Sequence, residues 1–240
     1  MSLLVSNIRL PFDAPEQQAL AEARRLTGLT ADEVQAAVCR VSIDARRGRI
    51  SRVYSVRLDA PFDEKAFAEH LQMPFVRYKP EEKPAVPRGK KRLSHRPVVV
   101  GLGPAGLFAA LFLARNGFPC VVLERGQDVD QRTRDVDRFW TAGALDEGSN
   151  VQFGEGGAGT FSDGKLTTGT HDPRIAAVLD TLVEAGAPAD VKYSHKPHVG
   201  TDVLRQVVKH IRQELIALGC DVRFGHRLEG LTIQGDALTG

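Results

Sequence analysis

The chain has 240 residues, of which 32 are lysine or arginine and 30 are aspartate or glutamate, so its formal net charge is only +2. Hydrophobic residues make up 42% and charged residues 26%, which is the profile of a soluble globular protein with one large or two smaller domains. The near-neutral charge argues against nucleic acid as the main partner, and the three widely spaced cysteines, without a CxxC motif, predict neither a disulfide scaffold nor a metal site.

Residues 1–76 predict a small α+β module. The start, MSLLVSNIRLPF, lacks the basic region and long apolar core of a secretory signal, so we expect a cytoplasmic protein. After this first strand, Asp13 and Gly28 mark the two ends of a helix, and TADE at Thr30–Glu33 is a second helix-capping pattern. Two strands then follow around a turn at Arg47–Gly48–Arg49, and DEKAFAEHL is a short helix. The order predicts a βαββα-like fold.

Residues 77–97 predict a linker, because four prolines and many charges leave little with which to form a core. Its basic run, 88–92, could in principle touch nucleic acid or a membrane surface. No aromatic or amphipathic pattern accompanies these charges, so a solvated connector is the favoured interpretation.

After Pro97, strand and helix patterns alternate, which predicts an α/β domain over residues 98–240. The expected strands are 98–100, 120–123 and 220–224, and a hairpin is expected at the end with its turn at Gly235–Asp236. The expected helices cover 104–116, the stretch before Gly143, 172–186 and 202–218.

The stretch VVVGLGPAGLFAALFLARNG, residues 98–117, is nearly long enough to cross a bilayer. Its glycines crowd one end, which suits a buried strand, a turn and a helix better than a continuous span. They form G-x-G-x-x-G at Gly101, Gly103 and Gly106. In this pattern the first glycine permits the tight turn, the second lets a pyrophosphate approach the backbone, and the third lets helix and strand pack closely.

Glu124 lies 23 residues after Gly101, at the end of the next expected strand. An acid at this position accepts hydrogen bonds from a ribose 2′-hydroxyl, and its charge would repel a 2′-phosphate. With Ala110 and Gly117 also fitting the pattern, a dinucleotide site is favoured over a chance glycine-rich turn.

The stretch NVQFGEGGAGTFSDGKL, Asn150–Leu166, contains five glycines in a long loop. Long loops inside compact domains are usually functional, since their backbone can approach a ligand closely. A nicotinamide domain ordinarily lacks such an insertion, whereas a flavin needs a second clamp around its ribityl chain and ring. The loop therefore favours FAD over NAD.

The stretch from Val98 to Gly126 resembles the amino-terminal FAD motif of glutathione-reductase-like flavoproteins, including its Glu-Arg-Gly ending. Together with RTRDVDRFW, the glycine-rich loop, KPHVGTDVLRQVV and SIDAR, the whole chain is similar to a bacterial family of FAD-dependent dehydrogenases with a small amino-terminal α+β module. The resemblance implies a Rossmann-like three-layer domain that binds FAD, with NAD(P)H as a candidate electron donor.

The resemblance also assigns residues by position. It implies that the pyrophosphate lies in a cradle and that Glu124, flanked by Arg125 and Gly126, holds the adenosine ribose, while Arg132 reaches the phosphates and Leu228 meets adenine through its backbone. The cradle residues are Gly101, Gly103, Pro104, Ala105 and Gly106, and the flavin side is lined by Gly156, Gly157, Ala158, Gly159 and Thr160. Lys165 is a candidate for a positive charge near the flavin and His198 for a proton donor, although a solvated lysine and a plain loop histidine are the alternatives.

Relatives of this kind return later in the chain with further strands, a substrate domain and a last FAD-contacting segment. The expectation is therefore that these 240 residues are the front part of a longer protein, with an incomplete FAD domain that holds the cofactor poorly alone. Substrate, catalytic residues and oligomeric state cannot be read from this sequence.

Three functions remain open at this point. The first is an FAD-dependent oxidoreductase. The second is a binding module that recruits RNA or another partner through Arg46, Arg47, Arg49 and Arg52, with the nucleotide fold as a sensor. The third is an NAD-binding dehydrogenase without flavin. The first is favoured because it accounts for both glycine-rich segments.

Overall fold

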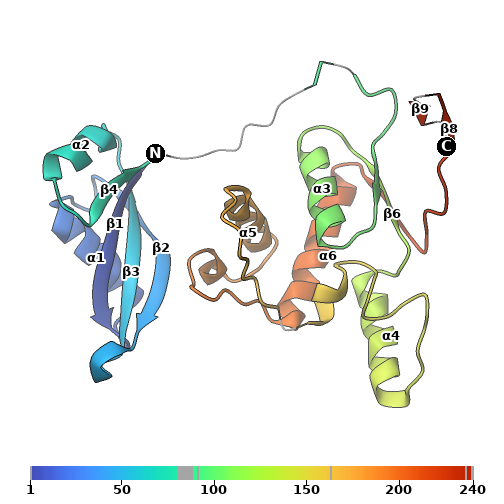
Figure 1. Ribbon diagram of the computed structural model, residues 1–240, viewed down its shortest axis with the longest axis horizontal. Helices are drawn as coiled ribbons and strands as arrows, with labels where there is room; N and C mark the ends of the chain where they lie inside the picture. The colour runs from blue at the N-terminus through green and yellow to red at the C-terminus, as the bar shows by residue number, and fades with distance from the viewer. Residues whose placement is uncertain (1, 81–88, 91, 163, 236, 239–240) are drawn as a thin grey trace. The chain divides into compact units, whose positions relative to one another are not determined.

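The computed structural model describes residues 2–80, 89–90, 92–162, 164–235 and 237–238 (Figure 1). The chain forms two compact units. Unit 1 comprises Met1–Val86, Leu166–Asp180 and Ala189–Pro197, and unit 2 comprises Pro87–Lys165, Thr181–Pro188 and His198–Gly240. The prediction placed every residue after 97 in the second domain, whereas unit 1 also contains these two later segments.

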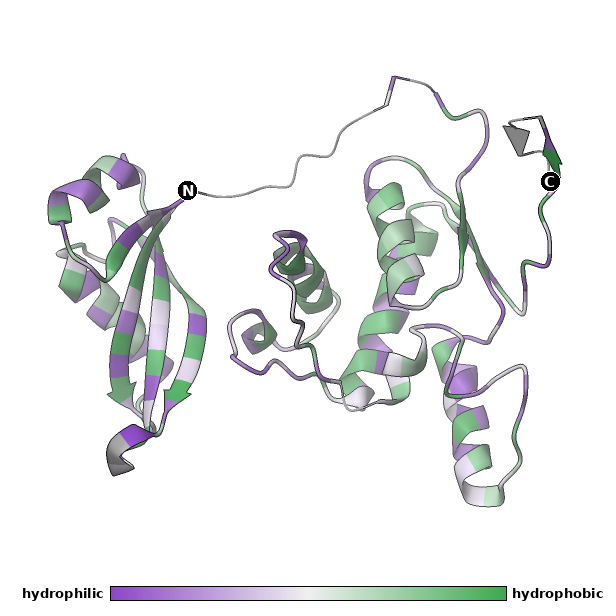
Figure 2. Cartoon of the chain, in the orientation of Figure 1, coloured by the Kyte–Doolittle hydropathy of each residue, from purple (hydrophilic) through white to green (hydrophobic). Residues whose placement is uncertain are grey.

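Unit 1 is built on a four-stranded antiparallel sheet in the order β2-β3-β1-β4. The strands are β1 (Ser2–Pro11), β2 (Gln35–Asp44), β3 (Ser51–Asp59) and β4 (Val76–Lys79). Alternating side chains of β1 and β3 are fully buried and form the core, as the alternation of colour along these strands in Figure 2 illustrates: Leu3, Val5, Tyr54, Val56 and Leu58. This period-two pattern is what a sheet with one covered face requires.

Two helices supply the rest of this core, α1 (Glu16–Thr27) and α2 (Glu64–Leu71). Gly28 ends α1 in the left-handed conformation, as predicted. The predicted cap at Asp13 is wrong, because Pro15 occupies the cap position and Asp13 makes no capping hydrogen bond there. The helix predicted after Thr30 is also wrong. Glu33 does accept hydrogen bonds from Thr30, but the chain continues into β2.

The first residues of the predicted linker are part of the sheet. Val76–Lys79 form β4, which pairs with β1, so the module has one strand more than the predicted βαββα order. A later segment also joins this unit at the β2 edge, where the Val41 N–H donates to the Tyr193 carbonyl at 2.8 Å. A strand this short, next to prolines and charges, is easily missed from sequence.

Unit 2 contains a parallel sheet in the order β5-β6-β7, with β5 (Val98–Val100), β6 (Val121–Glu124) and β7 (Asp221–Phe224). Helix α3 (Pro104–Arg115) packs on β5 and on α6 (Thr201–Ala217), and α6 packs on β7. Helix α4 (Val129–Ala142) follows β6, and α5 (Arg174–Glu184) begins in unit 1 and ends in unit 2. These elements match the predicted alternation and show the α/β class.

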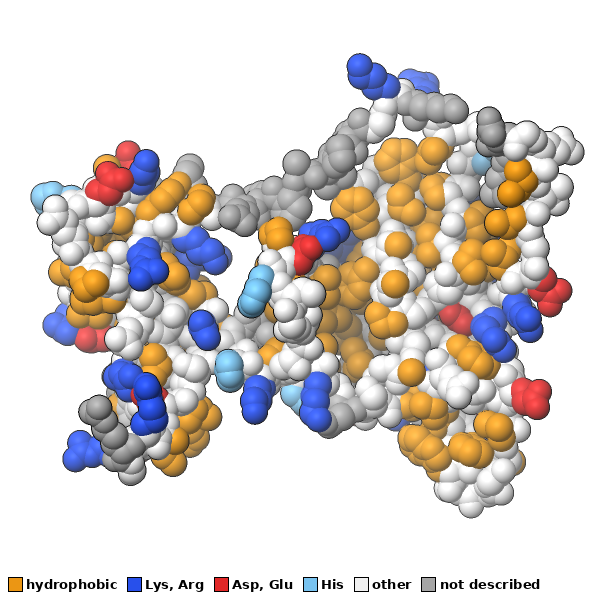
Figure 3. Space-filling model, viewed as in Figure 1, with side chains coloured by type: hydrophobic (Ala, Val, Ile, Leu, Met, Phe, Trp, Pro, Cys, Tyr) orange, Lys and Arg blue, Asp and Glu red, His pale blue; other side chains and the backbone are white. Residues whose placement is uncertain are grey.

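Strand β5 differs from the buried strand that the sequence predicts. It forms one edge of the sheet, and the side chains of Val98 and Val100 are 56% and 53% exposed. Helix α3 is hydrophobic along its length in Figure 2, and Phe112 on it is also exposed. Figure 3 shows hydrophobic side chains gathered over the part of unit 2 that carries α3. The run of valines therefore reflects an apolar surface as well as a core.

In the final hairpin, β8 (Ile233–Gln234) pairs with β9 (Ala237–Leu238) within the described residues. Gly235 has the positive φ of 58° that the predicted turn requires, whereas Asp236 lies outside the described residues. Among the helices that the structure describes, none is long and apolar enough to span a bilayer, α3 included.

Candidate functional site

The glycine-rich turn lies between β5 and α3. Gly101 adopts a φ of +88°, and its N–H donates to the Leu123 carbonyl at 2.7 Å, which ties the turn to the end of β6. Gly103 precedes Pro104, the first residue of α3, so the start of the helix is exposed at the carboxyl ends of the parallel strands. Free backbone N–H groups and the helix dipole at such a start attract phosphate.

The three glycines of the turn have the different environments that their predicted tasks require. A Cβ on Gly106 would lie 1.9 Å from the Gly101 oxygen, so only glycine lets helix and turn pack here. A Cβ on Gly103 would meet nothing closer than the Gly157 Cα at 3.9 Å. The surface at Gly103 is therefore open to a close-approaching ligand, as a pyrophosphate cradle must be.

Glu124 ends β6 and is buried, with only 3% of its surface exposed. Its Oε2 accepts the Leu102 N–H at 2.6 Å and its Oε1 accepts the Gly126 N–H at 2.8 Å. The carboxylate thus joins the glycine-rich turn to the residues after β6. Each carboxylate oxygen has a second lone pair, so this arrangement leaves acceptor capacity for a ribose hydroxyl.

The second glycine-rich segment packs directly on the turn. The Gly156 N–H donates to the Leu102 carbonyl at 2.8 Å, and a Cβ on Gly157 would meet Pro104 Cδ at 3.1 Å. Gly156 and Gly157 both have positive φ, and residues Ala158–Phe161 form a short 3-10 turn in which Thr160 is buried. The predicted cradle and the predicted flavin-side residues are therefore adjacent in the fold.

Arg132 of α4 holds this segment in place and is fully buried. Its guanidinium donates to the carbonyls of Asn150, Val151, Glu155 and Gly157. These contacts engage all five of its N–H groups. The resemblance implied that Arg132 reaches the phosphates. The structure instead directs its donors to the backbone of the loop. Burial lowers the pKa of Arg132 to about 10, and the guanidinium remains charged at neutral pH.

Glu155 was not identified from the sequence, and its side chain in the loop is buried with no exposed surface. Its Oε2 accepts the Val129 N–H at the start of α4 at 2.7 Å. Its Oε1 forms an ion pair with Arg212 Nε of α6 at 2.8 Å, although without the geometry of a hydrogen bond. Burial raises its pKa to about 7, against the opposing effects of the Val129 N–H and Arg212. The signal that could have identified Glu155 in the sequence is its position as an acid between two glycines, Gly154 and Gly156.

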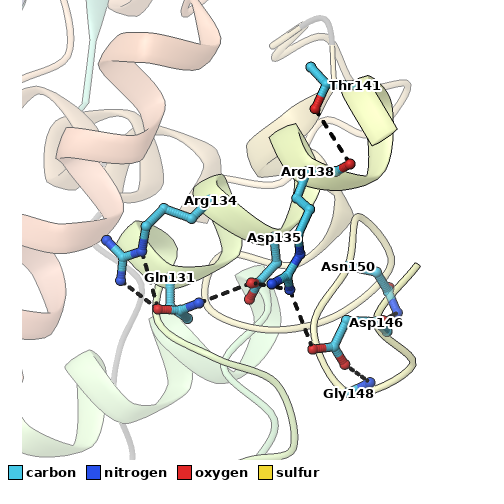
Figure 4. A network of polar contacts seen from close by, with 8 residues as sticks. All are labelled: Gln131, Arg134, Asp135, Arg138, Thr141, Asp146, Gly148 and Asn150. Carbon is cyan, nitrogen blue, oxygen red and sulfur yellow. Dashed lines mark hydrogen bonds and ion pairs between the residues drawn. The ribbon is translucent and has the colours of Figure 1, made fainter. Parts of the chain in front are cut away.

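The outer end of the loop is fastened by polar contacts along α4 (Figure 4). Asp135 accepts hydrogen bonds from Gln131 at 3.0 Å and from Arg138 at 2.9 Å. Arg138 also reaches Asp146, whose backbone carbonyl accepts the Asn150 side-chain amide at 3.1 Å. Polar contacts from α4 therefore hold the first part of the loop and the residues just before it, from Asp146 to Gly157.

The remaining predicted residues lie outside the glycine-rich turn. The exposed Arg125 places its guanidinium 3.8 Å from the centre of the Phe153 ring, so it contacts the loop. Lys165 pairs with His198 in an isolated antiparallel bridge, which brings the two candidates for charge and proton transfer together. Leu228 follows β7, lies outside any strand and is 41% exposed, and its backbone contact with adenine stays a prediction.

Taken together, the described residues form an open glycine-rich turn at the start of α3, a buried acid beside it and a glycine loop packed against it. All three lie at the carboxyl edge of a parallel sheet, where folds of this class bind nucleotides. The open surface at Gly103 and the spare acceptor capacity of Glu124 fit a dinucleotide that carries an unmodified ribose.

Comparison with known proteins gives two findings. A family model described as an FAD binding domain matches residues 96–240. The chain is also 42% identical over 241 residues to an uncharacterized protein of Clostridium beijerinckii, in a match that covers 99% of this chain and 45% of that protein. The chain thus spans less than half the length of the curated relative.

Proposed function

The chain belongs to the FAD-binding-domain family over residues 96–240, and from this premise we propose that its protein is an FAD-dependent oxidoreductase of the dehydrogenase type. The observation that carries the proposal is the direct packing of the glycine loop on the phosphate cradle, seen where Gly157 approaches Pro104. A simple NAD-binding turn has no need of this second element.

Each part of the site has a task in this proposal. The N–H groups at the start of α3 bind the pyrophosphate, and Glu124 binds the adenosine ribose. The loop from Gly156 to Thr160, which packs on Leu102 and Pro104, would hold the flavin side of the cofactor and exclude water there. When bound, FAD supplies the capacity to accept a hydride and to pass its electrons on.

We further propose that NAD(P)H is the electron donor and that the protein works in the cytoplasm on a small-molecule substrate or acceptor. The pairing of Lys165 with His198 places a cationic and a protonatable side chain on neighbouring backbone positions. This pair is our candidate for charge stabilisation and proton transfer during the reaction.

The experiment is to purify the whole natural protein that contains this chain, extract its bound cofactor and determine the mass of that cofactor. We expect FAD, a yellow protein with a flavin spectrum, and bleaching of that spectrum by NADH or NADPH without oxygen. Extraction of NAD alone would establish the flavin-free dehydrogenase instead, and absence of any dinucleotide would contradict the proposal.

The RNA-binding alternative receives little support from unit 1. Of the four arginines near the β2–β3 turn, Arg46 donates to Asp44 at 2.8 Å, and the Arg52 guanidinium lies 4.8 Å from the centre of the Phe12 ring. Two of the four charges are thus engaged by unit 1 itself. Salt-dependent retention of RNA by the protein would nevertheless favour this alternative.

A further inference from the structure

One face of α6 lies along the glycine loop. The Arg205 guanidinium stands 4.9 Å from the centre of the Phe161 ring, and the Arg212 Nε lies 2.8 Å from Glu155. Between these two arginines, Val208 packs against Gly156, since a Cβ on Gly156 would lie only 3.2 Å from Val208 Cγ2. The spacing of three and then four residues puts these side chains on one face of the helix.

Arg205 and Arg212 each have a buried Nε without a hydrogen-bond partner among the described residues. They differ in charge compensation, because Arg212 forms an ion pair with Glu155, whereas the described residues place no acid within ion-pair distance of the half-buried Arg205. Arg132, by contrast, directs all its donors to loop carbonyls. A guanidinium that lacks an acidic partner in the protein is less favourable than a paired one, and an anion bound at the exposed part of the Arg205 side chain would supply that partner.

The direction of α6 places Arg205 at the cofactor edge. The helix ends at Ala217 and the chain enters β7 at Asp221, so α6 runs opposite to β7. Because β7 is parallel to β5 and β6, the first turns of α6 lie near the carboxyl ends of the strands. The glycine-rich turn and the end of β6 at Glu124 are at this same edge.

We propose that Arg205 is an FAD-binding residue that donates to an anionic oxygen of the dinucleotide, the task that the resemblance implied for Arg132. The inference rests on the proposed function. The chemistry recognised is a phosphate oxygen, for which the planar guanidinium, with several donors, is suited. The Phe161 ring lies against the Arg205 guanidinium, and Val208 packs this part of α6 against the loop.

The test uses the whole natural protein, freed of cofactor and titrated with FAD while flavin fluorescence is followed. We expect Arg205→Met to weaken FAD binding by about tenfold or more, because a charge-assisted hydrogen bond is lost while the apolar stem remains. Arg205→Lys should recover part of the affinity. Arg134→Met serves as the matched control, since this exposed arginine of α4 contacts Gln131, and should bind FAD as the wild type does.

The outcomes separate the inference from the proposed function. Wild-type affinity in Arg205→Met would overturn the inference alone, as would equal weakening in Met and Lys variants together with a lower unfolding temperature of the cofactor-free protein. Failure of the wild type to bind FAD would overturn both. If Arg205→Met does not fold, the FAD affinities of Arg205→Lys and Arg205→Gln are compared, because these variants differ mainly in charge. Tighter binding by Arg205→Lys would support the inference, and equal affinities would overturn it.

Discussion

At the scale of single residues, spacing in the sequence predicted those positions whose task follows from the backbone. Gly101 and Gly106 are required by a positive φ and by a close contact, and both follow from the G-x-G-x-x-G pattern. The side chains of Arg132 and Glu155 could not be assigned in this way. Their partners are loop carbonyls and a helix start that only the tertiary fold brings to them.

Replacing Gly106 by alanine should destabilise unit 2 by about 1–3 kcal/mol, because the new methyl group would overlap the Gly101 oxygen, 1.9 Å from the Cβ position. Urea unfolding measures the effect. Gly159→Ala is the matched control, since a Cβ there meets nothing within 4 Å and the variant should remain within about 0.5 kcal/mol of the wild type. Equal stability of the two variants would contradict the packing described.

Replacing Glu124 by glutamine should weaken FAD binding by about tenfold, because one of its two acceptors for the Leu102 and Gly126 N–H groups becomes an amide donor. Fluorescence titration with FAD measures this change. The exposed Glu147 provides the control substitution Glu147→Gln. Unchanged retention of FAD by the Glu124 variant would refute its assignment to the ribose.

At the scale of elements, the sequence predicted each helix and parallel strand of unit 2 to within a few residues, because hydrophobic periodicity and glycine stops mark them well. The prediction failed for strands whose position depends on pairing between residues far apart in the sequence. Strand β4 is stabilised by β1, and β5 has exposed valines because the sheet ends there. The glycine loop has no periodic pattern, so its fastening between α4 and α6 could not be predicted.

Removing the guanidinium of Arg132 should loosen the glycine loop. In Arg132→Met, the carbonyls of Asn150, Val151, Glu155 and Gly157 lose their donor, and we expect a loss of about 2–4 kcal/mol in unfolding free energy. Limited proteolysis should then cut between residues 144 and 161 before any other site of unit 2 beyond residue 97. The Arg134→Met control should be cut like the wild type, and a loop that stays protected in Arg132→Met would show that α6 alone suffices.

The burial of Glu155 between α4 and α6 predicts a pH dependence of stability. Its pKa is raised to about 7 in the folded protein from an ordinary 4.5, so the folded state binds more protons than the unfolded state between these values. The resulting stabilisation is fully present below about pH 4.5 and is lost as the pH rises through 7. The change is on the order of 3 kcal/mol, from 2.5 pKa units at 1.36 kcal/mol each.

Unfolding by urea at pH 5, 6, 7 and 8 measures this effect. We expect Glu155→Gln to gain stability relative to the wild type as the pH rises from 5 to 8, because glutamine does not ionise. The charged groups around Glu155 are Arg212, Arg132, Asp128 and Asp130, of which Asp130 also pairs with Lys209. A constant difference between the two proteins across this range would mean that Glu155 does not titrate there.

At the scale of the whole molecule, the two units were expected to follow one another along the chain, separated by residues 77–97. The domain boundaries stay a prediction, but the compact units are interleaved in sequence. Unit 1 includes Leu166–Asp180 and Ala189–Pro197, and Val41 of β2 hydrogen-bonds to Tyr193. Nothing in the local pattern of either segment indicates a partner about 150 residues away, as the positions of Val41 and Tyr193 illustrate.

Limited trypsin digestion should cut first between Lys79 and Arg92, because this stretch is rich in prolines and charges and β4 ends at Lys79. We expect the two products to separate in denaturing electrophoresis but to elute together in native gel filtration. The later segments of unit 1 would hold them together. Separate elution would mean that the contact of β2 with Tyr193 contributes little.

The pairing of β2 with Tyr193 has a consequence for the order of events during synthesis. Strand β2 is the outer strand of its sheet, and the partner of its Val41 N–H is translated 152 residues later. At about 5–20 residues per second, the ribosome needs roughly 8–30 s to reach that partner. Throughout this interval the nascent module presents an unsatisfied strand edge, at which nascent chains on neighbouring ribosomes could pair wrongly. The strands of the amino-terminal module are therefore made well before the segment that completes the edge of their sheet.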